Sequence, residues 1–452
     1  MRTPIVPNLR LERSALWTVL LLAILGTATP ARAVPAFGAQ TGQPCSACHV
    51  GGFGPALTPY GRDFKLKGYT ARAGKWTVPL SMMAIASYVH TRADQPVEPT
   101  PDYSRNDNFT LDQVSLFLAG GVGSHFGGFV QGTYDGVGRA FAWDNLDLRA
   151  VVQTTIKGAD VVFGTTLNNS PTVQDVWNTL PAWGYPYTSS ALAPRPGASP
   201  LLAGGFAQHV LGLSGYAWIN SRVYLEGGAY GSPKARTLSD LGVDPTSPGN
   251  LVGLAPYGRI AFEHPLGNAV VQVGAFGMQA HLHPGLDNST GRSDRYTDLG
   301  LDASYQRARA NSDVIAANIR YIHEAQSLDA SYVLGGVDHA GNTLEDVRFD
   351  VAYYFRNRVG GTVGVFDTFG SSDALLYSGN LGFKPNSNGL SLQLDGTPFG
   401  NGGSPLGNRF NIRVGAQYTI YNKFDGGRTN YDGSGRNASD NNTARIFLWV
   451  AY

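Results

Sequence analysis

Hydrophobic and polar residues alternate with a period of two over most of this chain. From about Trp76 onward, short segments carry apolar residues at every second position, and clusters of Gly, Asn, Asp, Ser and Pro separate them. In residues 410–421 the even positions are Phe, Ile, Val, Ala, Tyr and Ile, whereas most odd positions are polar or glycine. Residues 344–355 and 296–305 repeat the arrangement. Such segments predict β-strands joined by turns and loops.

Alternation alone fits a soluble β-sandwich as well as a membrane barrel, because a sandwich strand also has one apolar face. The C-terminal segment and the connections favour the barrel. Residues 444–452 alternate in the same way and close on an aromatic residue, Tyr452. Connections along the chain alternate between short and long, as they do in transmembrane barrels. The short ones fall at 121–124, 157–160, 220–221, 265–268 and 356–358, and the long ones at 91–108, 169–205, 231–254, 370–388 and 425–441.

We therefore expect an all-β fold, a transmembrane antiparallel β-barrel of about sixteen strands over residues 76–452, with both ends on the periplasmic side. Fourteen or eighteen strands remain open, because residues 271–283 and 311–334 have ambiguous parity. A barrel of sixteen strands encloses a real lumen. We expect mixed charges to face that lumen, among them Arg149, Arg259, Glu263, Arg348 and Arg413.

The composition agrees with a barrel wall. Charged residues make up 15% of the chain, against about 25% in ordinary soluble domains, and 58 of the 452 residues are glycine. A net charge of +1 argues against nucleic acid as a partner, because nucleic-acid binding calls for a clustered basic surface. The one long apolar run, residues 15–28, is shorter than the roughly 20 residues that a spanning helix needs.

That apolar run belongs to a predicted export signal. Arg2, Arg10 and Arg13 precede it, and Ala31-Arg32-Ala33 follows it as a small-residue cleavage site. Residues 1–33 are predicted to be a secretory signal peptide, and the mature chain to begin at Val34. A retained anchor helix is the alternative. Export without spanning helices predicts a bacterial outer-membrane location for a barrel of this kind, with membrane lipid around it.

One motif carries specific chemistry. The chain has two cysteines, and both stand in Cys45-Ser46-Ala47-Cys48-His49, the C-x-x-C-H pattern of covalent c-type haem attachment. Two thiols at this spacing can each form a thioether to one macrocycle, and the adjacent His49 can then ligate the haem iron. A disulfide between Cys45 and Cys48 is the competing interpretation in an oxidising compartment. We expect one covalent haem c.

The sixth ligand of the haem iron is less defined. Met83 is the favoured methionine, because it is close to the motif in sequence and shares strand parity with Ser81 and Ser87. An open or water-filled sixth position is the alternative. The eight other histidines are scattered, and His281 and His283, which would share one strand face, are too few for a confident metal site.

The segment that carries the motif is too short to bury a haem by itself. Residues 34–75 number 42, too few to bury a haem in a hydrophobic core of their own. We therefore expect this monohaem cytochrome c segment to fold into the lumen of the barrel as a plug. A haem held there could receive electrons from one side of the membrane and deliver them to the other.

Residues 34–70 resemble the fused monohaem cytochrome-porin family of the bacterial outer membrane, whose best known members are iron(II) oxidases. The resemblance lies in Pro35-Ala36-Phe37, Gln40-Thr41-Gly42, Cys45 to His49, Leu57 to Arg62 and Phe64 to Tyr69. It implies that Cys45 and Cys48 hold the haem and that His49 ligates it. It also implies that electrons enter from extracellular iron(II) and leave to a periplasmic c-type cytochrome. The chain departs from the family spacing in the Gly-rich stretch Val50 to Gly54 and in Gly38-Ala39.

These observations predict an outer-membrane electron-transfer protein that oxidises extracellular iron(II) by outer-sphere transfer, an iron(II) oxidase if it is an enzyme. Such chemistry needs no catalytic residues, and the sequence carries no catalytic triad, phosphate loop or carboxylate pair. Three alternatives remain. The chain could be an electron conduit for a different donor, a transport porin with a haem plug or gate, or a barrel with a plain disulfide.

Overall fold

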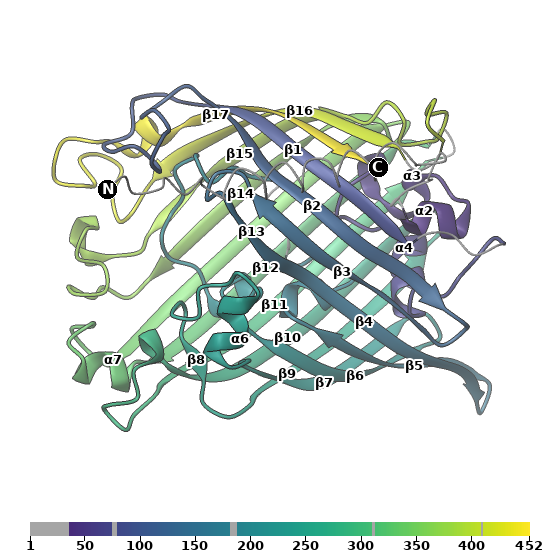
Figure 1. Cartoon of the computed structure of the whole chain (residues 1–452), viewed down its shortest axis with the longest axis horizontal. Coiled ribbons are helices and arrows are strands. Elements are labelled where there is room, and N and C mark those ends of the chain that lie inside the picture. Colours follow the sequence, from purple (N-terminus) through teal and green to yellow (C-terminus); the bar gives the residue numbers. More distant parts are fainter. Residues whose placement is uncertain (1–35, 75–78, 181–187, 310–311, 408–409) are drawn as a thin grey trace, which may run out of the picture.

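The protein is a β-barrel with a small helical segment at one end (Figure 1). The computed structural model describes residues 36–74, 79–180, 188–309, 312–407 and 410–452. The predicted signal peptide, residues 1–33, and the predicted start of the mature chain at Val34 lie outside the described residues. No helix in the described ranges is long and apolar enough to cross a membrane.

The strands occupy most of the chain from residue 80 onward, and the helices are short. The strands are β1 (Leu80–Thr91), β2 (Asn108–Val122), β3 (Phe126–Asp135), β4 (Ala140–Ile156), β5 (Ala159–Asn168), β6 (Leu211–Ile219), β7 (Val223–Gly231), β8 (Asn250–Leu251), β9 (Ala255–Leu266), β10 (Ala269–His283), β11 (Asp294–Ala308), β12 (Val314–Ser327), β13 (Gly341–Phe355), β14 (Val359–Gly370), β15 (Ser387–Gly396), β16 (Asn411–Lys423) and β17 (Thr443–Ala451). The helices are α2 (Ala36–Thr41), α3 (Cys45–Cys48), η1 (Val50–Gly52), α4 (Pro59–Leu66), α5 (Pro171–Gln174), η2 (Leu201–Ala203), α6 (Ala235–Asp240), η3 (Pro284–Leu286), α7 (Asp329–Val333), η4 (Leu381–Phe383) and η5 (Ala438–Asn441).

Sixteen of these strands form a closed antiparallel barrel. Each pairs with its neighbours along the chain, and β1 closes the ring by pairing with β17 from Met83 opposite Ala451 to Thr91 opposite Thr443. The two-residue β8 pairs only with the end of β10 and is not part of the wall. The expected fold class and the strand count of sixteen are confirmed. The two stretches whose alternation was ambiguous are now assigned. Residues 271–283 belong to β10, and residues 312–334 include β12 and the short helix α7.

The outer face of the strands is apolar, and the inner face carries most of the polar and charged side chains together with buried aromatic and aliphatic ones such as Phe276 and Met278. In β16 the even positions Val414 and Tyr418 are exposed, whereas the odd positions Asn411 and Arg413 are buried. The lumen-facing charges expected from the sequence are confirmed: Arg149, Arg259, Glu263 and Arg413 are buried inside, and Arg348 is half-buried there. A wall that is apolar outside and charged inside is the arrangement of a membrane-spanning barrel.

The connections gather at two ends, with two exceptions to the expected alternation. Most turns at one end, the turn end, are short, and most loops at the other end, the loop end, are long (Figure 1). However, residues 136–139 make a short connection at the loop end, and residues 397–410 make a long one at the turn end. The long connection has a reason to be there, because it contacts the N-terminal segment through a hydrogen bond from the Ser46 N–H to the Gly400 carbonyl, 3.0 Å.

The lumen is filled from both directions. Helices α2, α3 and α4 lie inside the turn end (Figure 1), where the Arg62 Nε lies 2.9 Å from Glu263 of β9. From the loop end, the connection between β5 and β6, described over residues 169–180 and 188–210, folds inward, and residues 171–177 are buried. Within it, the backbone N–H groups of Leu201 and Leu202 donate to the carboxylates of Glu324 and Asp298 on the inner wall.

Candidate functional site

The two cysteines of the C-x-x-C-H motif begin and end the short helix α3, and His49 follows it in an extended conformation. Pro44 precedes α3, and Cys45 and Cys48 lie three positions apart, on the same side of a helical turn. The His49 N–H donates to the Cys45 carbonyl over 2.9 Å, and the His49 backbone itself is extended. The two thiols are not joined in a disulfide.

Helix α4 packs directly against this turn. Thr58 caps its N-terminus by accepting a hydrogen bond from the Gly61 N–H, and Pro59 occupies the first helical position, which lacks an internal partner for an N–H in any case. A side chain at Gly61 would meet the Cys48 carbonyl oxygen, because a Cβ there would lie 2.3 Å from that atom. Glycine therefore lets α4 lie against the motif.

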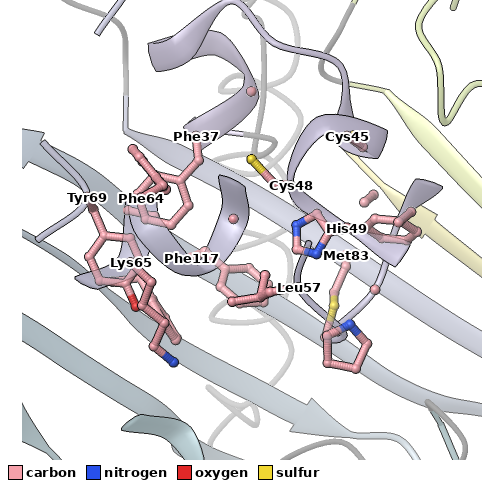
Figure 2. Close-up of a pocket in the computed structure, with 18 of the residues that line it drawn as sticks. Phe37, Cys45, Cys48, His49, Leu57, Phe64, Lys65, Tyr69, Met83 and Phe117 are labelled. Atoms are coloured by element: carbon pink, nitrogen blue, oxygen red, sulfur yellow. The ribbon is translucent and has the colours of Figure 1, made fainter. Parts of the chain in front are cut away.

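The motif lines a cavity between the N-terminal segment and the barrel wall. The cavity has a volume of about 220 Å³. Figure 2 shows Cys48, His49 and Met83 around this hollow, with Phe37, Phe64 and Tyr69 across from them. Besides the N-terminal segment, strands β1, β2, β3 and β17 of the wall and the inward loop line the cavity. Their lining residues include Met83, Phe117, Phe129, Trp449, Thr172 and Val173.

The three motif side chains are electrically neutral in these surroundings. Burial and, to a smaller extent, the Arg413 charge lower the pKa of His49 to about 4, against the opposing effect of the Gly54 backbone. Burial and the neighbouring Cys45 together raise the pKa of the Cys48 thiol to about 12. The His49 Nδ1 is buried and has no hydrogen-bond partner among the described residues. A neutral imidazole is the form that ligates a metal.

Glycines fix the chain immediately after His49. Gly51 and Gly52 have φ angles of 71° and 76°, in the left-handed region that favours glycine. A Cβ on Gly51 would lie 2.6 Å from the Arg413 Nη2 and 2.8 Å from the Tyr354 ring. The Gly-rich stretch of residues 50–54 is thus one of the parts of the N-terminal segment that lie directly against the barrel wall.

Polar contacts then hold this stretch in place. The Arg413 Nη2 donates to the Gly51 carbonyl over 3.1 Å. On the neighbouring turn, the Asn357 side chain accepts from the Gly51 N–H over 2.6 Å and donates to the His49 carbonyl over 3.2 Å. The position of His49 in the cavity is therefore set by two barrel residues that are more than 300 residues away in sequence.

The far end of the segment is anchored by a buried ionic cluster. The Lys65 Nζ lies 3.6 Å from Asp147 of β4 and donates to the Val173 carbonyl of the inward loop. The Tyr69 hydroxyl donates to the same Asp147 carboxylate over 2.7 Å, and Arg149 pairs with it at 3.0 Å. Burial lowers the pKa of Lys65 to about 8 although Asp147 opposes the change. This cluster joins the N-terminal segment, the wall and the inward loop.

The lining residues fit a c-type haem. The cavity surface is mainly apolar and aromatic, as a macrocycle requires. Its donor set consists of two free thiols and a neutral imidazole with an unpartnered buried nitrogen. If haem is bound, Cys45 and Cys48 would hold it, His49 would ligate its iron, and the aromatic walls would exclude water.

The structure brings together the residues that the sequence predicted. Cys45, Cys48, His49 and Met83 all line the one cavity. Met83 is 5% exposed and points inward with Ser81 and Ser87, whereas Met82 is 42% exposed on the outer face. Ligation by Met83 stays a prediction. Sequence reasoning missed Asn357, because nothing in a turn Asn signals a contact with a motif so distant in the chain.

The other predicted features lie apart from this cavity. His281 and His283 occupy alternate positions of β10 on its outward-facing side and share a face, as expected. Within the described ranges, no group of three or more His, Cys, Asp or Glu side chains could hold a metal ion.

These features define a class: a sixteen-stranded membrane-spanning barrel whose lumen holds an N-terminal segment with a C-x-x-C-H motif. No protein-family model matches the sequence, and no curated protein matches it. Among solved structures, the outer membrane channel DcaP of Acinetobacter baumannii is similar, with 13% identity, a TM-score of 0.45, and coverage of 85% of this chain and 99% of that chain. OprB of Pseudomonas putida has 12% identity, a TM-score of 0.47, and coverage of 82% and 94%. An anion-selective porin from Comamonas acidovorans has 11% identity, a TM-score of 0.43, and coverage of 82% and 98%. What this barrel does has to be inferred from its own residues.

Proposed function

We propose that this protein is an outer-membrane electron-transfer protein that carries one covalent haem c in the cavity at the turn end of its barrel. The observation that carries the proposal is the placement of Cys45, Cys48 and His49 on an apolar cavity inside a membrane-spanning wall. We further propose, with the resemblance to the cytochrome-porin family, that electrons come from extracellular iron(II) and go to a periplasmic c-type cytochrome. The turn end would then face the periplasm.

The chain's own residues supply positioning and exclusion of water. A bound haem c supplies a one-electron iron couple. The N-terminal segment is held by the buried contacts of Arg62, Lys65 and Gly51 with the wall, so the motif stays at a fixed place relative to the membrane. Iron(II) gives up one electron and no bond to carbon changes, so the site needs no general acid or base.

The rival function, a transport porin with a haem plug or gate, is less well supported by the lumen. A gate has to move out of the channel. The N-terminal segment is instead tied to the wall by the buried pair of Arg62 and Glu263, 2.9 Å apart. The inward loop adds a second obstruction, because the Trp177 Nε1 donates to the same Glu263 carboxylate over 2.8 Å. Expelling the plug would break the Arg62–Glu263 pair together with the buried contacts of Lys65 and Gly51 with the wall and the inward loop.

Stopped-flow reduction tests the proposed function. The purified, oxidised protein is mixed with iron(II), and the haem absorption bands are followed. We expect reduction by iron(II) in the wild type and a changed spectrum and slower reduction in His49→Ala. An oxidised haem that iron(II) cannot reduce would overturn the choice of donor and would favour a conduit for a different donor. An absence of haem would overturn the electron-transfer function itself.

A further inference from the structure

The surface of the turn end carries an excess of positive charge. Seven exposed basic residues lie on its turns, at the adjoining strand end or on the N-terminal segment, and no salt bridge to a described residue is found for any of the seven. Three carboxylates lie among them: Asp63 is paired with Lys67 at 2.8 Å, Asp313 is buried and Asp160 is exposed, while Glu263 is paired with Arg62 inside the lumen. The seven basic residues, which we call the basic rim, are Arg72, Lys157, Arg222, Arg307, Arg309, Arg356 and Arg358.

The loop end has no such excess. Residues 92–107 carry four carboxylates and two arginines, and Arg139 beside them is paired with Asp102 at 2.6 Å. In the connection between β7 and β9, Lys234 and Arg236 are matched by Asp240 and Asp244. The protein therefore has a charge asymmetry along the axis of the barrel, and the basic pole is the end that holds the C-x-x-C-H motif (Figure 1).

The basic rim is close to the motif through a specific turn. Arg356 and Arg358 flank Asn357, whose side chain bonds to the Gly51 N–H and to the His49 carbonyl. Arg72, from the N-terminal segment itself, donates to the Gly121 carbonyl at the end of β2. A partner that contacts the rim would consequently lie against the turns that support the cavity.

We propose that the basic rim is the docking surface for an acidic, soluble electron-carrier protein, an inference that rests on the proposed function. Phospholipid headgroups are the alternative anions, and they would be reached by outward side chains at strand ends, such as Arg307. Arg222, Arg309, Arg356 and Arg358 instead lie on turns. Complementary charge of this kind steers association and selects the partner.

A matched pair of probes tests the docking surface. Mitochondrial cytochrome c is basic, and succinylation converts its surface lysines to carboxylates without changing its backbone. Binding of each form to the purified full-length protein is measured by calorimetry at low and high salt. We expect the succinylated form to bind and to lose at least tenfold in affinity at high salt, and we expect the native form not to bind. Equal binding of both forms would overturn the proposal.

Charge reversals locate the surface. The triple variant Arg222→Glu, Arg309→Glu, Arg358→Glu should weaken binding of the succinylated probe at least tenfold. The control triple Lys234→Glu, Arg236→Glu, Arg292→Glu, at the loop end, should change it less than twofold. Heat-dependent gel mobility checks that both variants keep the barrel. Equal effects of the two triples, or binding to anionic phospholipid vesicles with none to the succinylated probe, would overturn the proposal.

The haem-free variant separates this inference from the proposed function. Docking by charge does not require haem, so Cys45→Ala with Cys48→Ala should bind the succinylated probe with an affinity within twofold of wild type. If the wild-type protein carries haem but does not bind the probe, the docking surface is overturned and the proposed function stands. If the wild-type protein carries no haem, the electron carrier is overturned as the partner, whatever the measured affinity.

Discussion

At the scale of single residues, the site depends on small side chains as much as on the motif. His49 has a defined place because Gly51 accepts a left-handed backbone and lies against Arg413 and Tyr354. A side chain at that position would collide with both. The Gly-rich stretch therefore fits the N-terminal segment closely against this part of the barrel wall.

Gly51→Ala should loosen the N-terminal segment. The left-handed backbone alone costs an alanine about 1–2 kcal/mol, and its Cβ would lie 2.6 Å from the Arg413 Nη2. Hydrogen exchange of the amides in residues 45–66 should accelerate about tenfold or more. Gly74→Ala is the control, because a Cβ there meets nothing within 4 Å. Exchange in Gly51→Ala at the wild-type rate would contradict this account of the Gly-rich stretch.

Glu263→Gln should destabilise the protein more than any loss of a surface ion pair. The change leaves the buried Arg62 guanidinium without a countercharge, which costs about 3–5 kcal/mol. The exposed pair of Arg139 and Asp102 offers the comparison, since Asp102→Asn should cost about 0–1 kcal/mol. Chemical unfolding followed by tryptophan fluorescence measures both. Similar losses for the two variants would show that the plug is not held by its buried pair.

At the scale of elements, the strands and the placement of the N-terminal segment inside the lumen were predictable, whereas the inward course of the loop between β5 and β6 was not. In β13 and β16 one face meets lipid and the other a polar lumen, so apolar and polar residues alternate. The sequence therefore showed which positions face inward. The inward course of the loop between β5 and β6 depends on contacts such as Trp177 with Glu263, 86 positions apart. A local pattern carries no signal for such a contact. The same holds for the long connection at the turn end, whose length reflects its contact with Ser46.

The candidate site divides in the same way. Cys45, Cys48 and His49 could be identified because covalent attachment fixes their spacing, and the inward direction of Met83 followed from strand parity. Asn357 and Arg413 could not, because their roles arise only when the barrel closes around the N-terminal segment.

A single carboxylate joins two of the loops at the loop end, and the stability of their contact should depend on pH. Burial alone would raise the pKa of Asp373, but hydrogen bonds from the backbone of Leu376, Asp338 and His339 and from the Asn342 amide outweigh it and hold the pKa at about 2. A carboxyl pKa that is lowered on folding stabilises the folded loops above about pH 4 and loses that effect as pH falls through about 2.

The loops of residues 328–340 and 371–386 should therefore stay joined at pH 4 and open near pH 2. Asp373→Ala should give at pH 7 the rapid amide exchange that the wild type shows only near pH 2. Exchange measured by mass spectrometry over this pH range checks it. Asp338→Ala serves as the control, because its exposed side chain makes no such set of contacts. Wild-type loops that already exchange rapidly at pH 4 would contradict the assignment.

At the scale of the whole molecule, a filled lumen distinguishes an electron conduit from a diffusion pore. The N-terminal segment closes the turn end and the inward loop occupies the middle, whereas an open sixteen-stranded barrel would conduct ions. In planar bilayers the purified protein should show conductance at least tenfold below that of an open porin measured under the same conditions. Steady openings of porin size would contradict the closed lumen and would favour the transport function.

The most direct test of the account is whether haem is covalently attached. The protein is purified from the membrane fraction, denatured, freed of loosely bound cofactors and assayed by its reduced pyridine haem spectrum. The account predicts one haem per chain that survives denaturation, and none in the Cys45→Ala, Cys48→Ala variant, which should still form a barrel with heat-dependent gel mobility. A wild-type protein without covalent haem would contradict the central claim.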